Sequence, residues 1–320
     1  MNLLVTGGAG FIGVNFIGYM LEAYPDYRIV CYDLMTYAAN PDCIDRFEEN
    51  PHFRFVKGDI RDREAVYALF EEEDFDAVVN FAAESHVDRS IENPDVFITT
   101  NVMGTSVLLD ACLRYGKVRF HQISTDEVYG DLPFESNYAF SETDRLSPSS
   151  PYSASKASAD LLVLSYARTF DLPVTISRSS NNYGPYQHSE KLIPTVIRKI
   201  TDDEKIPVYG NGKNLRDWIH VNDHCKAIDL ILHKGTHGEI YNVATEKEQS
   251  NIDTVHALLS VTGKDASLIS FVADRPGHDL RYAVSCSKIK AQLGWHPETD
   301  FSEGLRKTVD FYVKKFSKEN

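Results

Sequence analysis

The stretch Gly7-Gly8-Ala9-Gly10-Phe11-Ile12-Gly13 decides the fold. It follows the short apolar run Leu3-Leu4-Val5-Thr6, which favours a strand, and it opens the segment Gly10–Ala23, which we expect to be helical. A strand, a tight glycine turn and a helix in this order begin a βαβ unit. The chain is therefore predicted to start at the ligand-binding edge of a parallel sheet.

The same glycines indicate a dinucleotide. Gly8, Gly10 and Gly13 satisfy the pattern GxGxxG, in which glycine lets the backbone approach a pyrophosphate and the helix amino terminus offers unpaired N–H groups. Asp33 lies about 20 residues beyond Gly13, at the end of the second predicted strand, where a carboxylate would bond both ribose hydroxyls. A carboxylate there would also repel a 2′-phosphate, so the sequence predicts NAD rather than NADP.

Short β-rich runs alternate with helical stretches through residues 1–180, which is typical of a Rossmann-type α/β fold, a doubly wound parallel sheet. After Ser179 proline and glycine become frequent, so we expect a smaller, loop-rich α/β lobe over residues 181–320. A strand at 217–221 and a helix at 223–232 are expected to return to the main domain, within a segment near 217–245. The other expected strands are 3–6, 28–32, 53–57, 77–81, 120–124 and 174–178, and the other expected helices are 10–23, 62–72, 94–115 and 152–170.

Composition excludes several classes of function. The net charge of −14, without a basic stripe, argues against nucleic-acid binding. The five cysteines are scattered without a CxxC pair, so neither a disulfide framework nor a metal site is expected. No apolar run approaches the roughly 20 residues of a membrane span, and no charged-then-apolar leader precedes the first strand. We therefore expect a cytoplasmic protein with no nucleic-acid or membrane partner.

Tyr152 and Lys156 are four residues apart in a predicted helix, so both project from one face. A free tyrosine has a pKa near 10 and is a poor base at neutral pH. A neighbouring ammonium and a positively charged nicotinamide would lower that pKa, and a shift of about three units requires roughly 4 kcal/mol. With the glycine turn upstream, the pair resembles the short-chain dehydrogenase/reductase superfamily, in its extended, nucleotide-sugar branch.

Asp126 and Glu127 follow the fifth predicted strand, at the edge where ligands bind. Removing water across C5–C6 of a hexose needs a base for the C5 proton and an acid for the departing hydroxyl, and oxidation at C4 makes that proton acidic. Two adjacent carboxyls can fill these roles if their environments separate their pKa values. Taken alone, the two acids could equally be a solvated acidic turn. The position of the pair just after a buried strand argues against this alternative.

From Gly7 to Trp295 the sequence resembles the dTDP-glucose 4,6-dehydratase family. The specific segment is STDEVYG (124–130), because related 4-epimerases usually lack the Asp-Glu pair and other dehydratases and decarboxylases tend to carry Thr-Ser-Glu. The remaining matching segments are GGAGFIG (7–13), YDLMTYA (32–38), NFAAESHVDRSI (80–91), SPYSASKASAD (150–160), RSSNNYGPYQ (178–187), EKLIP (190–194), GNGKNLRDWIHVNDH (210–224) and DRPGHDLRYA (274–283).

This resemblance implies a redox-neutral cycle in which NAD is held tightly. Tyr152 would deprotonate the 4-hydroxyl while NAD takes the C4 hydride, and Thr125 would bond the same oxygen. Glu127 would remove the C5 proton and Asp126 would protonate the leaving 6-hydroxyl, after which the hydride returns to C6. The expected catalytic set is Thr125, Asp126, Glu127, Tyr152 and Lys156, and the expected NAD contacts are Gly7, Gly10, Phe11, Ile12, Gly13, Asp33, Thr36, Asp59, Ile60, Ala82, Ala83, Tyr152 and Lys156.

Several of these residues have a purely structural alternative. Asp59 could contact adenine or cap a helix. Ser85 and His86 could line the sugar site, or be a helix cap and a satisfied polar neighbour. Lys191 could meet the pyrophosphate or be a surface charge, and the same alternative holds for Arg275. The expected substrate-binding set is Ser85, His86, Thr125, Asn181, Lys191, Leu192, Arg216, Asn251 and Arg275.

Departures from the family pattern leave part of the function open. Ala39 stands where glycine is usual, Gln187-His188-Ser189 where an aromatic-Pro pair is common, and Ala283-Val284-Ser285 where Ala-Ile-Asp is usual. The last two lie near the nucleotide lobe, so a UDP- or CDP-sugar stays possible as substrate. A nucleotide-sugar 4-epimerase and a silent NAD binder are the other functional alternatives. The resemblance also implies a homodimer through helices 94–115 and 152–170, whose leucines could equally be buried within one domain.

Overall fold

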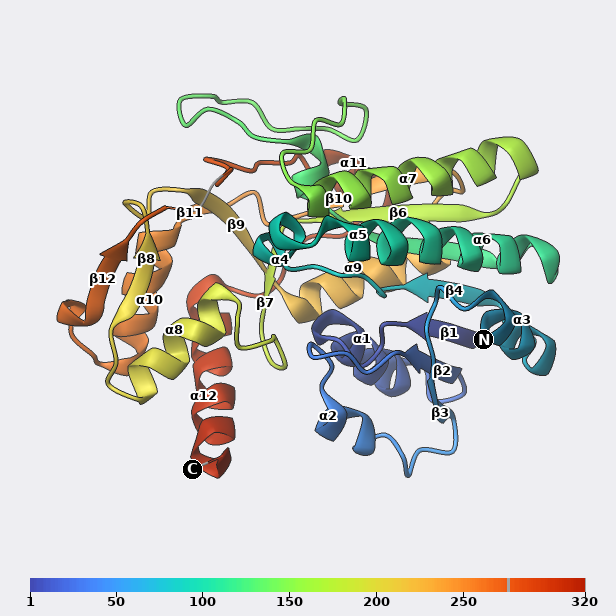
Figure 1. The fold of residues 1–320 in the computed structure, drawn as a ribbon, viewed down its shortest axis with the longest axis horizontal. Coiled ribbons are helices and arrows are strands. Elements are labelled where there is room, and N and C mark those ends of the chain that lie inside the picture. The colour runs from blue at the N-terminus through green and yellow to red at the C-terminus, as the bar shows by residue number, and fades with distance from the viewer. Residues whose placement is uncertain (275–276, 320) are drawn as a thin grey trace.

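The computed structural model describes residues 1–274 and 277–319. Its centre is a seven-stranded sheet of order β10-β6-β5-β4-β1-β2-β3, in which every pairing is parallel (Figure 1). This is the predicted Rossmann-type arrangement. The strands are β1 (Asn2–Thr6), β2 (Arg28–Asp33), β3 (Phe53–Lys57), β4 (Ala77–Asn80), β5 (Arg119–Thr125), β6 (Val174–Ser179) and β10 (Glu239–Val243).

Helices cover both faces of this sheet. α3, α6 and α7 share one apolar cluster with the strands, and α1 and α9 share the other. β1 contributes side chains to both clusters, since Leu4 belongs to the first and Leu3 and Val5 to the second. The helices of this part are α1 (Phe11–Ala23), α2 (Pro41–Asp45), α3 (Arg63–Glu72), α4 (Val87–Glu92), α5 (Pro94–Phe97), the π-helical η1 (Ile98–Gly104), α6 (Thr105–Arg114), the 3₁₀ turn η2 (Asp126–Tyr129), α7 (Pro151–Phe170) and α9 (Val221–Lys234).

The glycine turn between β1 and α1 is fixed by close backbone approach. Gly7 has a φ of +68°, and a Cβ there would lie 2.5 Å from the backbone nitrogen of Ala82, just after β4. A Cβ on Gly13 would lie 2.5 Å from the carbonyl oxygen of Gly7. Only glycine fits both positions, so the turn brings the amino terminus of α1 directly to the sheet edge.

The helix expected at 94–115 is not one regular α-helix. It consists of α5, η1 and α6, and its π-helical middle was not predicted. Within η1 the buried Asn101 bonds the backbone of Glu84 and the hydroxyl of Ser155, so contacts from two other segments hold this stretch. By length and composition alone the segment Pro94–Arg114 could cross a membrane, but half of its most apolar window is buried inside the fold, as in a core helix.

The second lobe packs around its own apolar cluster. α8, α10 and α12 surround two small sheets, of order β11-β9-β7 and β12-β8. The strand expected at 217–221 begins at Leu215 as β9. We expected it to join the large sheet, but it pairs with β7 and β11 in a small sheet. The strand that does join the large sheet is β10, which was not predicted. The remaining elements are β7 (Asn181–Tyr183), α8 (Leu192–Thr201), β8 (Ile206–Tyr209), β9 (Leu215–His220), β11 (Glu248–Ser250), α10 (Asn251–Thr262), η3 (Ala266–Leu268), β12 (Ile269–Val272), α11 (Ser287–Leu293) and α12 (Phe301–Glu319).

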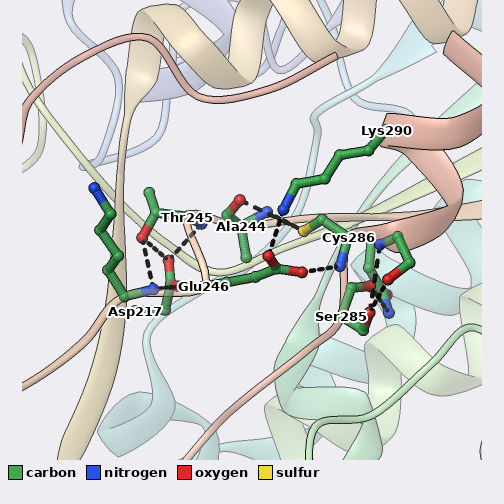
Figure 2. Close-up of polar contacts among 10 residues, drawn as sticks. Asp217, Ala244, Thr245, Glu246, Ser285, Cys286 and Lys290 are labelled. Atoms are coloured by element: carbon green, nitrogen blue, oxygen red, sulfur yellow. Dashed lines mark hydrogen bonds and ion pairs between the residues drawn. The ribbon is translucent and has the colours of Figure 1, made fainter. Parts of the chain in front are cut away.

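Buried polar contacts join the two parts of the chain where β10 leaves the large sheet. Figure 2 shows residues 244–246 of the loop after β10 between Asp217 of β9 and Cys286, which precedes α11. The Asp217 carboxylate accepts hydrogen bonds from the backbone nitrogens of Thr245 and Lys247 at 2.9 Å and from the hydroxyl of Ser180. Glu246 accepts from the backbone nitrogen of Cys286 at 2.7 Å. The loop therefore fixes the second lobe against the carboxyl edge of β6.

Candidate active site

A cavity of about 330 Å³ follows the carboxyl edge of the large sheet. Its walls come from the β1–α1 turn, the ends of β2 to β6, the start of α7 and the loop before α8. This is the edge at which open α/β sheets bind ligands. All the expected NAD contacts and all five expected catalytic residues line it: Gly7, Gly10, Phe11, Ile12, Gly13, Asp33, Thr36, Asp59, Ile60, Ala82, Ala83, Thr125, Asp126, Glu127, Tyr152 and Lys156.

The part of the cavity lined by the β1–α1 turn and the end of β2 fits a dinucleotide. Gly10 caps α1 without a side-chain hydrogen bond, so the N–H groups of the first turn stay available to a phosphate. The Asp33 carboxylate is oriented by the backbone nitrogens of Ala9, at 3.0 Å, and Met35, at 2.7 Å. Each carboxylate oxygen keeps a lone pair for a ribose hydroxyl. Asp33, the glycine turn and α1 would therefore hold the adenosine and pyrophosphate of NAD.

Tyr152 and Lys156 lie at the other end of the cavity, on the first two turns of α7. Pro151 and a capping box between Ser150 and Ser153 start this helix. Lys156 Nζ donates to the carbonyl oxygen of Ile123 at 2.6 Å, which holds its ammonium against β5. Burial lowers the pKa of Lys156 to about 8.

Burial also raises the pKa of Tyr152, and the neighbouring Glu127 and Asp126 add to this effect. The sequence led us to expect that Lys156 lowers this pKa. In the protein alone the interactions that raise it outweigh the hydrogen bond with Thr125, which lowers it. Glu127 and Asp126 thus oppose ionisation of Tyr152.

Asp126 is buried, whereas its neighbour Glu127 is only half-buried. The Asp126 Oδ2 atom has no hydrogen-bond partner, and Oδ1 is 3.4 Å from the hydroxyl of Thr125. Burial, followed by the charges of Glu127 and Asp217, raises the pKa of Asp126 well above its usual range. The raised pKa favours the protonated form of Asp126, which is the form that can act as a general acid.

Known proteins resemble the chain over nearly its whole length. A family model described as GDP-mannose 4,6 dehydratase matches residues 4–308. A dTDP-glucose 4,6-dehydratase of Xanthomonas campestris pv. campestris is 50% identical, over 97% of this chain and 92% of its own. The chain belongs to the dTDP-glucose 4,6-dehydratase family.

Two further comparisons agree with this membership of the dTDP-glucose 4,6-dehydratase family. The low-salt glycan biosynthesis protein Agl12 of Haloferax volcanii is 51% identical, over 98% of this chain and 99% of its own. The crystal structure of DesIV, a dTDP-glucose 4,6-dehydratase of Streptomyces venezuelae, superposes with a TM-score of 0.95 at 45% identity, over 99% of this chain and 98% of its own. That crystal structure holds NAD. The predicted family and fold are confirmed.

The expected substrate residues of this dehydratase fold divide into two groups. Ser85, Asn181 and Lys191 line the cavity together with Thr125, and the Oδ1 atom of Asn181 is buried without a partner. Lys191 Nζ donates to the carbonyl oxygen of Ser85 at 3.0 Å, which ties the loop before α8 to the segment after β4 at the cavity wall. The residues outside the cavity lining are His86, Leu192, Arg216 and Asn251, and Arg275 lies outside the described residues.

The geometry shows structural contacts for two of the residues that have a structural alternative. His86 caps α4, since its Nδ1 accepts from the backbone nitrogen of Arg89 at 3.4 Å. Asp59 does not cap α3, because Asp62 does so; Asp59 instead pairs with Arg61 at the cavity wall. Arg216 is buried with its guanidinium bonded to the carbonyl oxygens of Leu215 and Asp279, so its pyrophosphate contact stays a prediction.

The cavity also contains polar residues that we did not expect in it. They follow β4 and β6 or lie in the loop before α8. Part of the signal was present, because side chains at the carboxyl ends of parallel strands face the ligand-binding edge. These residues are Glu84, Ser179, Ser180, Asn182, Gln187, His188 and Glu190.

Proposed function

We propose that this enzyme converts dTDP-glucose to dTDP-4-keto-6-deoxyglucose and water, with NAD as a cofactor that ends each cycle unchanged. The observation that carries this proposal is Asp126, a buried acid of raised pKa beside Glu127, in the same cavity as Tyr152 and Lys156. A nucleotide-sugar 4-epimerase needs the tyrosine and the lysine but has no use for the two carboxyls. The family's NAD-dependent dehydratase chemistry accounts for all four residues.

When bound, NAD supplies the hydride acceptor and donor. The protein's own part of the first step is to take the 4-hydroxyl proton of the sugar at the Tyr152 oxygen. Thr125 supports this, because its hydrogen bond favours the phenolate of Tyr152 against the effects of burial and of the neighbouring Glu127. Lys156, held against β5, supplies a cation near the same site.

The dehydration itself is assigned to the two carboxyls. Glu127, half-buried at the cavity wall, removes the C5 proton once C4 is a ketone. Asp126 gives its proton to the departing 6-hydroxyl, which then leaves as water. Their different burial assigns the roles, because the more buried acid is the one that keeps its proton.

We further propose that residues 1–180 bind NAD and residues 181–320 bind the nucleotide part of the substrate. Asn181 and Lys191 lie where the two parts meet. Thymidine is proposed as the base because the dehydratase relatives carry that name. In the part of the chain that the structure describes, four cysteines are free and buried, which fits a reducing compartment such as the cytoplasm.

The protein is also proposed to be a homodimer through α5, η1, α6 and α7. Large apolar side chains are exposed on this surface, with Met103 at 58%, Leu161 at 59% and Ile98 at 44% exposure. Exposed apolar surface of sufficient size marks an interaction site. η1 and α7 pack against each other, so Met103, Ile98 and Leu161 lie on neighbouring helices.

The test is to incubate the purified protein with dTDP-glucose, without added reductant, and to follow the sugar nucleotide by mass spectrometry. We expect loss of one water and no accumulation of NADH. A parallel reaction with UDP-glucose tests the base. Dehydration of UDP-glucose alone would overturn the thymidine assignment, and a product of unchanged mass but altered stereochemistry would identify an epimerase.

A further inference from the structure

Asp160 of α7 and Arg178 of β6 form an ion pair in the interior of the protein. Arg178 Nε donates to Asp160 Oδ2 at 2.9 Å, and neither residue is more than 1% exposed. Removing two charges from water is expensive, and apolar side chains of similar size often stabilise a protein as well or better. Stability alone therefore does not account for this pair.

The position of the pair connects it with the reaction. Asp160 follows Lys156 by one helical turn on α7, so the two side chains share a face. Arg178 lies on β6 directly opposite Ser124 of β5, and its guanidinium lies 4.8 Å from the ring centre of Tyr129 in η2. The pair thus contacts both the helix that carries the redox residues and the turn that carries the carboxyls.

We propose that Asp160 is a positioning residue for Lys156, supplying the negative charge that balances this buried ammonium from the next turn of α7, and that Arg178 holds the Asp160 carboxylate in place. The inference rests on the proposed function for the role of Lys156 in the reaction. It assigns to Asp160 no contact with substrate or cofactor.

The electrostatics of Lys156 agree with this geometry. Burial lowers the pKa of Lys156 from 10.5 to about 8, and the charge of Asp160 acts in the opposite direction. Without that charge the pKa would fall further. Lys156 would then lose its proton within the neutral range, where the enzyme needs a cation beside Tyr152.

The other charged groups around α7 do not replace Asp160. Tyr152 lies on the same helix, and η2 brings Asp126, whose pKa is raised by burial, and the half-buried Glu127. In β5, Arg119 and His121 are bonded to α9 and to alternate residues of β6, away from α7. η1 has no titratable residue. The charged residues of α4, α5 and α6 are exposed or half-buried: Asp88, Arg89, Glu92, Asp95, Asp110 and Arg114.

The direct test is an NMR titration of Lys156 in protein labelled with ¹³C-lysine, with the signal assigned by its loss in Lys156→Met. We expect Asp160→Asn to lower the pKa of Lys156 by at least about one unit, as the loss of a nearby buried charge implies. Asp160→Asn leaves Arg178 unpaired and can impair folding. The double variant Asp160→Asn/Arg178→Met removes both charges. Its Lys156 pKa should lie between the values of the wild type and of Asp160→Asn.

The second readout is the pH profile of kcat/KM with dTDP-glucose. The alkaline limb should move to lower pH in Asp160→Asn and partly back in the double variant. A purely structural role would instead lower the melting temperature and the activity at every pH, without moving the limb. Equal Lys156 pKa values in all three proteins would overturn the inference. If the wild type does not dehydrate dTDP-glucose, the proposed function fails, while the NMR titration still decides the role of Asp160.

Discussion

Asp126 combines a catalytic assignment with a cost in stability. Below its ordinary pKa of 3.8 the carboxyl is protonated in both the folded and the unfolded chain. As the pH rises above 3.8, the unfolded chain ionises first, because the folded pKa is raised, and the free energy of unfolding falls. This loss continues until the pH passes the folded pKa. A neutral side chain of the same shape would not show it.

Asp126→Asn should therefore lose activity and gain stability. We expect kcat to fall about 10²- to 10⁴-fold, the usual contribution of a general acid. The melting temperature should match the wild type near pH 4 and exceed it by a margin that widens as the pH rises. Calorimetry across that range and the mass-spectrometric assay measure the two effects. Glu92→Gln, which changes an exposed acid on α4, should change neither, and a constant margin would contradict the raised pKa.

At the scale of single residues, local motifs identified the chemistry, but folding determines its electrostatics. Tyr152 and Lys156 were named from their spacing, Asp126 and Glu127 from their place after a strand and from the family resemblance, and all four line one cavity. The raised pKa of Tyr152 was not predicted, because it depends on burial and on carboxyls 25 and 26 residues earlier in the chain. Spacing along a helix reports which side chains are neighbours and does not report how much water surrounds them.

Among the elements, the β1–α1 turn makes the sharpest prediction. A Cβ on Gly13 would lie 2.5 Å from the Gly7 carbonyl oxygen and 2.7 Å from the Cα of Gly8, so Gly13→Ala must displace α1. We expect a loss of about 1–3 kcal/mol in the free energy of unfolding. NAD affinity should also fall, measured by calorimetric titration, because the amino terminus of α1 moves from the phosphate position.

The matched control is Gly263→Ala at the end of α10. Gly263 also has a positive φ, of +67°, but a Cβ there meets no atom within 4 Å. This variant should lose about 1–2 kcal/mol from backbone strain and bind NAD as the wild type does. Equal NAD affinities in the two variants would show that α1 tolerates the displacement.

Element boundaries in the first 180 residues follow from sequence where the pattern is local. β3 was predicted to the residue, and the six strands predicted there all exist. The π-helical η1 was not predictable in the same way, because the sequence 94–115 is compatible with a regular helix throughout. Its geometry depends on Asn101 bonding Glu84 and Ser155, residues 17 and 54 positions away.

For the whole molecule, sequence patterns do not report which sheet a short strand joins. β10 has five residues and pairs with β6, about 60 residues earlier, while β9, of six residues, joins the small sheet. The junction depends on Asp217, whose carboxylate holds the loop after β10. Contacts of this kind between distant segments determine which sheet a strand joins, and residue spacing does not report them.

The last prediction concerns assembly. Leu161 on α7 and Met103 on η1 are 59% and 58% exposed, and we expect them to be covered by a second copy of the chain. A glutamate placed there would be buried without a partner in the dimer, so Leu161→Glu and Met103→Glu should shift light scattering from dimer to monomer. Phe271→Glu is the control, because Phe271 is also 59% exposed but lies on β12 of the second lobe. A monomeric wild type would refute this interface. So would dissociation of the dimer by Phe271→Glu alone, because the two copies would then meet at β12 and not at η1 and α7.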